Sequence, residues 1–101
     1  MATRAKSNST SRLTSRQLRA IARAVSEPRR FDILRHIAAA PKCSACSELR
    51  EQFPVSAPTL SHHLKELEAA GLIEIVRRGK FIDARFCRET WDAYLAELRS
   101  L

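Results

Sequence analysis

Two cysteines with a C-x-x-C spacing, Cys43 and Cys46, are the residues of this sequence best suited to metal or redox chemistry. Two thiolates at that spacing can bind a soft metal or metalloid, and a nearby helix N-terminus lowers the pKa of a thiol. A structural zinc ion normally takes four ligands, so the pair alone does not define such a site. Three interpretations stay open: a metal or metalloid site, a thiol switch that responds to oxidants or electrophiles, and no regulatory role.

A second chemical pattern lies in residues 56–71, where short hydroxyls, histidines and a lysine accompany leucines at helical spacing. The leucine stripe consists of Leu60, Leu64 and Leu67. The opposite side of the predicted helix carries Pro58, Thr59, His62, Lys65 and Glu66. A helix of this kind packs on the protein body through its leucines and presents a polar, partly cationic face outward. That face is suited to an anionic, ridged surface.

Catalysis is not expected from the adjacent pair His62 and His63. Consecutive residues of a helix point about 100° apart, so the two imidazoles do not converge on one substrate. The sequence contains neither a glycine-rich phosphate loop nor an H-E-x-x-H motif. His63 lies toward the leucine side, where packing or a backbone hydrogen bond is its expected role and a DNA contact is the alternative.

Four helices and a β-hairpin are expected to position these residues, with the 56–71 helix as the fourth. A T-x-x-Q capping box at Thr14 starts the first helix, and Glu27-Pro28 starts the second. Ser44 is expected to cap a short third helix, which a turn joins to the 56–71 helix. A short helix, a tight turn and a longer helix with a polar outer face form the helix-turn-helix pattern.

After Gly71 the apolar period changes from helical to alternating, which predicts two strands within residues 73–86. Gly79 supplies the positive φ of a tight hairpin, whose tip is basic. A last helix is expected from about Glu89 to Leu101. The predicted fold class is mainly α with a small β-hairpin (α+β), a winged helix-turn-helix with the order α-α-α-α(recognition)-β-β-α. The hairpin tip is well placed to meet phosphates or the minor groove, and its cations are Arg77, Arg78 and Lys80.

The first and last helices carry more large apolar side chains than a domain of 101 residues readily buries. A symmetric dimer would cover both faces. The side chains predicted at this interface are Leu18, Ile21, Val25, Trp91, Tyr94, Leu95 and Leu98.

Charge is concentrated at the start of the chain. The net charge is +7, and residues 1–25 contain six basic and no acidic side chains, which leaves +1 for residues 26–101. Residues 1–13 are expected to be a disordered basic arm, and residues 14–101 one domain for DNA binding and dimerisation. No apolar run of ~18 residues predicts a membrane span, and no secretory signal is recognised. Three cysteines, an odd number, favour a reducing cytoplasm.

Several motifs resemble those of one family, the ArsR/SmtB regulators. Residues 26–34, SEPRRFDIL, resemble its "DPTRLRIL" motif, and residues 56–67, SAPTLSHHLKEL, closely resemble its "SQPTVSHHLKVL" recognition helix. Residues 70–73 and 77–81 are similar to the end of that helix and to the wing. The resemblance covers roughly residues 18–100.

The resemblance implies a homodimeric, cytoplasmic transcriptional repressor that binds a pseudo-palindromic operator in double-stranded DNA and releases it on an unidentified signal. The implied base-proximal or phosphate-capping residues are Ser56, Thr59, Ser61 and His62, and the implied phosphate contacts are Lys65, Arg77, Arg78 and Lys80. The alternative is a winged helix that binds another protein and has no DNA specificity.

The resemblance leaves the role of the cysteines open. Family members that sense arsenic or lead carry a C-x-C motif just before an acidic residue and a leucine. The same motif in this chain would require cysteines at positions 45 and 47. The chain has Ala45 and Ser47 instead, and its last helix has no histidine for the zinc site that other members build there. Cys43 and Cys46 stay candidates for a thiophilic metal or metalloid, with Cys87 as a third thiol.

Overall fold

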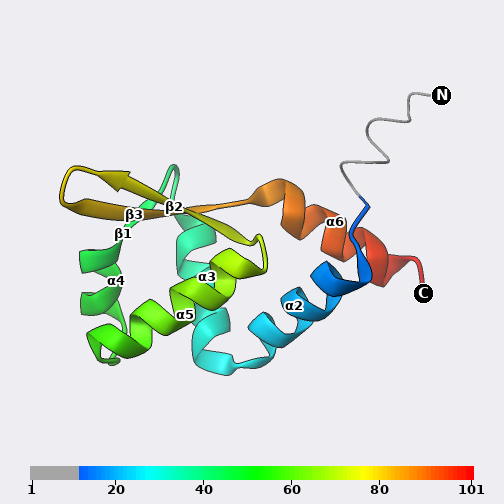
Figure 1. Ribbon diagram of the computed structural model, residues 1–101, viewed down its shortest axis with the longest axis horizontal. Helices are drawn as coiled ribbons and strands as arrows, with labels where there is room; N and C mark the ends of the chain where they lie inside the picture. The colour runs from blue at the N-terminus through cyan, green and yellow to red at the C-terminus, as the bar shows by residue number, and fades with distance from the viewer. Residues whose placement is uncertain (1–11) are drawn as a thin grey trace.

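A computed structural model describes residues 12–101, which form five helices and a three-stranded antiparallel sheet (Figure 1). The elements are α2 (Ser15–Ser26), α3 (Pro28–Ala39), β1 (Ser44–Ala45), α4 (Cys46–Gln52), α5 (Ala57–Ala69), β2 (Ile73–Arg78), β3 (Phe81–Phe86) and α6 (Arg88–Arg99). This order confirms the predicted winged helix-turn-helix and adds one short strand. Residues 1–11 of the predicted basic arm lie outside the described residues.

The first two helices begin where their capping residues predict. Thr14 Oγ1 accepts a hydrogen bond from the Gln17 amide at 3.1 Å, and Gln17 Oε1 accepts one from the Thr14 amide at 2.9 Å. This reciprocal capping box satisfies two amides that a helix start otherwise leaves unpaired. At α3, the Glu27 carboxylate accepts the Arg30 amide at 2.7 Å and Pro28 occupies the first turn.

The sheet has the order β1-β3-β2, so β3 is its central strand. The expected hairpin is present, with Ile75 opposite Ala84 in its antiparallel register, and Gly79 at its tip has φ +63°. The prediction of Ser44 as a helix cap is wrong. Ser44 of β1 pairs with Ala84, and the N-cap of α4 is Ala45, which makes no side-chain cap. The strand was missed because two residues are too few to show an alternating pattern.

One hydrophobic core joins the helices to the sheet. The helix α5 lies on α2, α3 and β2 through the predicted leucine stripe, in which Leu60, Leu64 and Leu67 are 3%, 7% and 0% exposed. Ile21 of α2 is also 0% exposed within the single chain. The prediction that Ile21 lies at a dimer interface therefore needs correction, because its side chain has no surface left for a partner. Among residues 12–101, no helix is long and apolar enough to cross a membrane.

A buried carboxylate fixes the hairpin to the segment before β1. Asp83 of β3 is 2% exposed and accepts hydrogen bonds from Arg78 Nε at 2.9 Å and from the Cys43 thiol at 3.5 Å. Arg78 Nη2 lies 2.7 Å from the same carboxylate oxygen, Oδ2. A buried carboxylate without partners is costly, so Arg78 has a structural task at the wing. Two of its five N–H donors are used by Asp83 and the others stay available.

We expect Arg78→Ala to destabilise the protein more than Arg77→Ala does. The first substitution leaves Asp83 with the thiol alone, at a cost of about 1–2 kcal/mol, below the full penalty because water reaches this exposed arginine. The second removes an exposed side chain that makes no ion pair with residues 12–101. Urea unfolding at neutral pH measures both effects, and equal losses for the two variants would contradict the role of the ion pair.

Candidate nucleic-acid interface

The outer face of α5 carries the polar residues predicted to approach DNA. Ser56 is the N-cap, and its Oγ accepts the Thr59 amide at 3.3 Å and lies 2.9 Å from Thr59 Oγ1. These two hydroxyls are therefore held at the N-terminus of the helix, where the backbone dipole favours an anion. The side chains on this face are all exposed, and they are Ser56, Thr59, Ser61, His62 and Lys65. The helix thus offers short donors near its start and a lysine about two turns later.

The wing presents its cations at the far end of the hairpin from α6 (Figure 1). Arg77 and Lys80 are exposed and make no ion pair with residues 12–101, so both can meet an external phosphate. Arg78 differs from them because its guanidinium already binds Asp83. The structure therefore separates the three wing cations, which the sequence treats alike, into two outward charges and one that also stabilises the fold.

His63 has the packing role expected for it. It is 7% exposed, and its Nε2 lies 3.9 Å from Oε1 of Glu27, the residue that caps α3. Burial lowers the pKa of His63 and outweighs the opposing effect of the Glu27 carboxylate. A neutral His63 thus links the inner side of α5 to the start of α3. Its neighbour His62 points outward, so the adjacent histidines have separate surroundings.

The thiols do not assemble a metal site within residues 12–101. No three side chains of the His, Cys, Asp and Glu types lie close enough together there to hold an ion. Cys43 is exposed and donates to Asp83, whereas Cys46 is half-buried at the start of α4. Burial raises the pKa of Cys46, and the Asp83 charge raises it further. Burial also raises the pKa of Cys87, which lies at the start of α6. This donor set does not fit the four ligands of a tetrahedral zinc ion.

The side chains predicted at a dimer interface fall into two groups. Ile21 belongs to the core, whereas the others keep surface that a partner can cover. Leu98 is 47% exposed, and the half-buried members are Leu18, Val25, Trp91, Tyr94 and Leu95. The rings of Trp91 and Tyr94 lie 5.7 Å apart. Helices α2 and α6 lie at the same end of the long axis, opposite the wing (Figure 1).

Sequence reasoning missed Asp83 and Arg50. Asp83 alternates with Ile82 and Ala84, a pattern typical of an outward-facing side chain, yet it is 2% exposed and accepts hydrogen bonds from Arg78 and Cys43. Arg50 was left out because α4 carries no motif. Its side chain lines a cavity between α4, α5 and the hairpin, together with Cys46 and Lys65.

Comparisons with known proteins agree with this geometry. A family model described as a helix-turn-helix domain matches residues 25–76, just over half of the chain. An ArsR-like transcriptional regulator from Rhodococcus sp. RHA1 is 28% identical with a TM-score of 0.74, over 83% of this chain and 77% of that one. The chain belongs to the ArsR family of winged helix-turn-helix transcriptional regulators.

Further ArsR-family structures share the fold. The crystal structure of another ArsR family transcriptional regulator is 25% identical with a TM-score of 0.77, over 87% of this chain and 89% of that one. The winged helix-turn-helix DNA-binding domain of a possible ArsR-family regulator from Mycobacterium bovis, described as homodimeric, is 22% identical with a TM-score of 0.69, over 83% of this chain and 78% of that one. No curated protein sequence matches the chain. This ArsR-family chain therefore carries the DNA-binding domain of a transcription regulator.

Acid is expected to destabilise this ArsR-family protein through His63. Because burial holds the pKa of His63 in the folded chain below that of a free imidazole, the unfolded chain takes up the proton first as the pH falls. Stability should therefore decrease as the pH falls below about 6.5. His63→Leu should flatten this dependence between pH 7.5 and 5.5, measured by urea unfolding. His62→Gln, on the exposed side, is the matched control and should keep the wild-type slope, whereas equal slopes for wild type and His63→Leu would refute the assignment.

Proposed function

We propose that this protein is a homodimeric, sequence-specific transcriptional repressor that binds a pseudo-palindromic operator and releases it on a signal. The observation that carries the proposal is the division of α5 into two sides. Its leucines are buried in the core, and its hydroxyls, His62 and Lys65 are exposed along one face. A helix fixed in this way can enter the major groove without disturbing the core.

The exposed side chains divide by the kind of contact they can make. Short hydroxyls and the imidazole of His62 can hydrogen-bond to base edges or to nearby phosphates. Lys65 on α5 and the wing cations Arg77 and Lys80 are long and charged, so they suit phosphate oxygens. Arg78 can also contact a phosphate, through the guanidinium N–H groups that Asp83 does not use. Base contacts would set the sequence preference, and the cations would set the affinity and its dependence on salt.

Dimerisation is supported by the apolar surface on α2 and α6. Leu98 of α6 is 47% exposed, and the rings of Trp91 and Tyr94 on the same helix are half-buried. Two recognition helices related by a two-fold axis would read two half-sites, so we expect a pseudo-palindromic operator. The Mycobacterium bovis domain of the same fold is described as homodimeric, which agrees with this assignment.

Repression is the simplest consequence of such binding, since a dimer seated on a promoter excludes other proteins from the same DNA. Release on a signal requires a ligand or modification that favours the unbound state. The cysteine pair alone gives no complete metal site in residues 12–101, so the signal must be sought in other features of the chain as well.

Fluorescence anisotropy with a duplex from the chain's own promoter, at two salt concentrations, tests the function. We expect specific binding that weakens steeply with salt. Arg77→Ala should weaken binding to all duplexes alike and lower the salt slope by about one, because one phosphate contact is lost. His62→Ala should relax the preference at one position per half-site by about 1–3 kcal/mol, the value of one good base contact.

A selection from random duplexes distinguishes the two variants. An unchanged consensus for His62→Ala would remove it from the base-contacting set, and an Arg77→Ala effect confined to one sequence would remove Arg77 from the phosphate set. Failure of the wild-type protein to bind any duplex at low salt would refute the repressor proposal and favour a protein-binding winged helix.

Leu98→Glu should convert the dimer to a monomer in sedimentation experiments, because it places a charge within the proposed apolar interface. The matched control is Phe81→Glu, since Phe81 is 65% exposed and lies on the wing, away from α6. The control should remain dimeric. A wild-type monomer at tens of micromolar, or a dimeric Leu98→Glu variant, would contradict this interface.

A further inference from the structure

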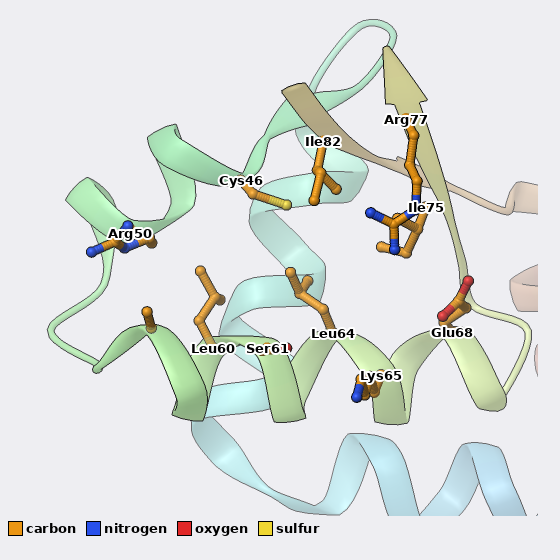
Figure 2. Close-up of a pocket in the computed structure, with 11 residues that line it drawn as sticks. Cys46, Arg50, Leu60, Ser61, Leu64, Lys65, Glu68, Ile75, Arg77 and Ile82 are labelled. Carbon is orange, nitrogen blue, oxygen red and sulfur yellow. The ribbon is translucent and has the colours of Figure 1, made fainter. Parts of the chain in front are cut away.

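A cavity of about 230 Å³ lies between α4, α5 and the hairpin (Figure 2). Its lining comes from Cys46 and Arg50 on α4, from α5, and from the two strands β2 and β3. The cavity therefore lies between the recognition helix and the wing, the two elements proposed to hold DNA.

The walls of the cavity are aliphatic. Leu60 and Leu64 of α5 form one side, and Ile75 of β2 and Ile82 of β3 form the other. Figure 2 shows the side chains of Leu60, Leu64 and Ile82 directed into the same space. The volume lies below the ~300 Å³ at which sites for drug-sized ligands begin, so these walls suit a small, compact apolar group.

Cations outnumber acids around this apolar space. Arg50, Lys65 and Arg77 line it, and Glu68 is the one acidic residue of the lining. In Figure 2 the guanidinium of Arg77 is turned from β2 toward the space above α5. None of the three cations makes an ion pair with residues 12–101. Positive charge without a partner beside an apolar wall favours an anion that carries an apolar body.

The thiol of Cys46 also faces the cavity, and Figure 2 shows its sulfur pointing inward. Because burial and then Asp83 raise the pKa of Cys46, the thiol stays protonated at neutral pH. A neutral thiol adds a soft, weakly polar surface and does not repel an anion. The cavity thus combines aliphatic walls, a neutral thiol and three unpaired cations.

We propose that this cavity binds a small organic acid, with its carboxylate toward Arg77, its apolar body between the aliphatic walls, and Arg50 and Lys65 adding positive charge at its rim. The ligand and DNA then compete for the same cations, because Lys65 and Arg77 belong to both sites. Binding of the acid therefore weakens binding of the operator. This regulatory half of the proposal rests on the proposed function and names the chemical class of its signal.

A DNA phosphate is the other anion that can reach these cations. It has no apolar body to occupy the space between Leu60, Leu64 and Ile82, so it would leave the aliphatic walls in contact with water. Burial of apolar surface is therefore the energy that distinguishes the organic acid from phosphate. The test must separate an apolar carboxylate, its neutral analogue and inorganic phosphate.

Calorimetric titration of the full chain without DNA provides the first test. The probes are benzoate, benzamide as the neutral analogue of the same shape, and inorganic phosphate. We expect saturable binding of benzoate, with benzamide at least about tenfold weaker, because charge-assisted hydrogen bonds to the carboxylate are lost. Phosphate should fail to displace benzoate at equal concentration. Benzamide binding as tightly as benzoate, or phosphate displacing it, would overturn the proposal.

Three variants outside the proposed DNA contacts, one of them a control, locate the site. Arg50→Gln should weaken benzoate about tenfold by removing one cation, whereas Lys42→Gln, an exposed lysine that does not line the cavity, should leave it unchanged. Cys46→Phe should fill the cavity and abolish benzoate binding, with circular dichroism confirming that the variant folds. Benzoate bound equally by wild type and Arg50→Gln would place the ligand elsewhere and refute the site.

The competition is then measured with the promoter duplex. Saturating benzoate should raise the Kd for DNA, and saturating DNA should raise the Kd for benzoate by the same factor, since coupling between two ligands is reciprocal. Benzamide is the control and should have no effect. If the wild-type chain binds no duplex, the repressor proposal fails while the first titration still decides the ligand site. If DNA binds equally with and without benzoate, the regulatory half is refuted.

Discussion

The structure depends on the contact between the leucine side of α5 and the core. Leu60, Leu64 and Leu67 are almost fully removed from water, and each buried side chain of this size contributes roughly 1.5–3 kcal/mol. This burial fixes the rotation of α5 about its own axis. The exposure of Thr59, His62 and Lys65 therefore follows from the position of the leucines, and His63 is buried on the same inner side.

The wing is positioned by a different kind of interaction. Asp83 lies in the central strand β3, is almost fully buried, and receives hydrogen bonds from Arg78 and from the Cys43 thiol before β1. A buried carboxylate tolerates few arrangements of its donors, so this one ties the hairpin to the segment that leads into the helix-turn-helix. The sheet thus links the two elements proposed to contact DNA. Of the wing cations, Arg77 and Lys80 make no ion pair with residues 12–101, whereas Arg78 also stabilises the wing through Asp83.

Local signals made most of this fold predictable. The capping box at Thr14, the leucine spacing of α5 and the glycine of the hairpin depend on neighbouring residues, so each can be read directly from the sequence. Contacts between distant segments could not be read in this way. The strand β1 is only two residues long, the Asp83 carboxylate is buried against partners from β2 and from the segment before β1, and Ile21 is used by the core and not by a partner. The exposed face of α5 was foreseen, whereas the cavity beside it required α4 and the hairpin to be placed together.

The placement of that cavity has a consequence for how such a protein can be regulated. A signal that acts far from DNA must change the relative position of two elements, and the change must pass through a packed core. An anion bound between α5 and the wing needs no such change. It neutralises Lys65 and Arg77 where they stand, and the phosphate contacts they would make are lost directly. Regulation by occupancy of shared charges is therefore compatible with a small core held in one arrangement by its leucines and by the buried carboxylate of Asp83.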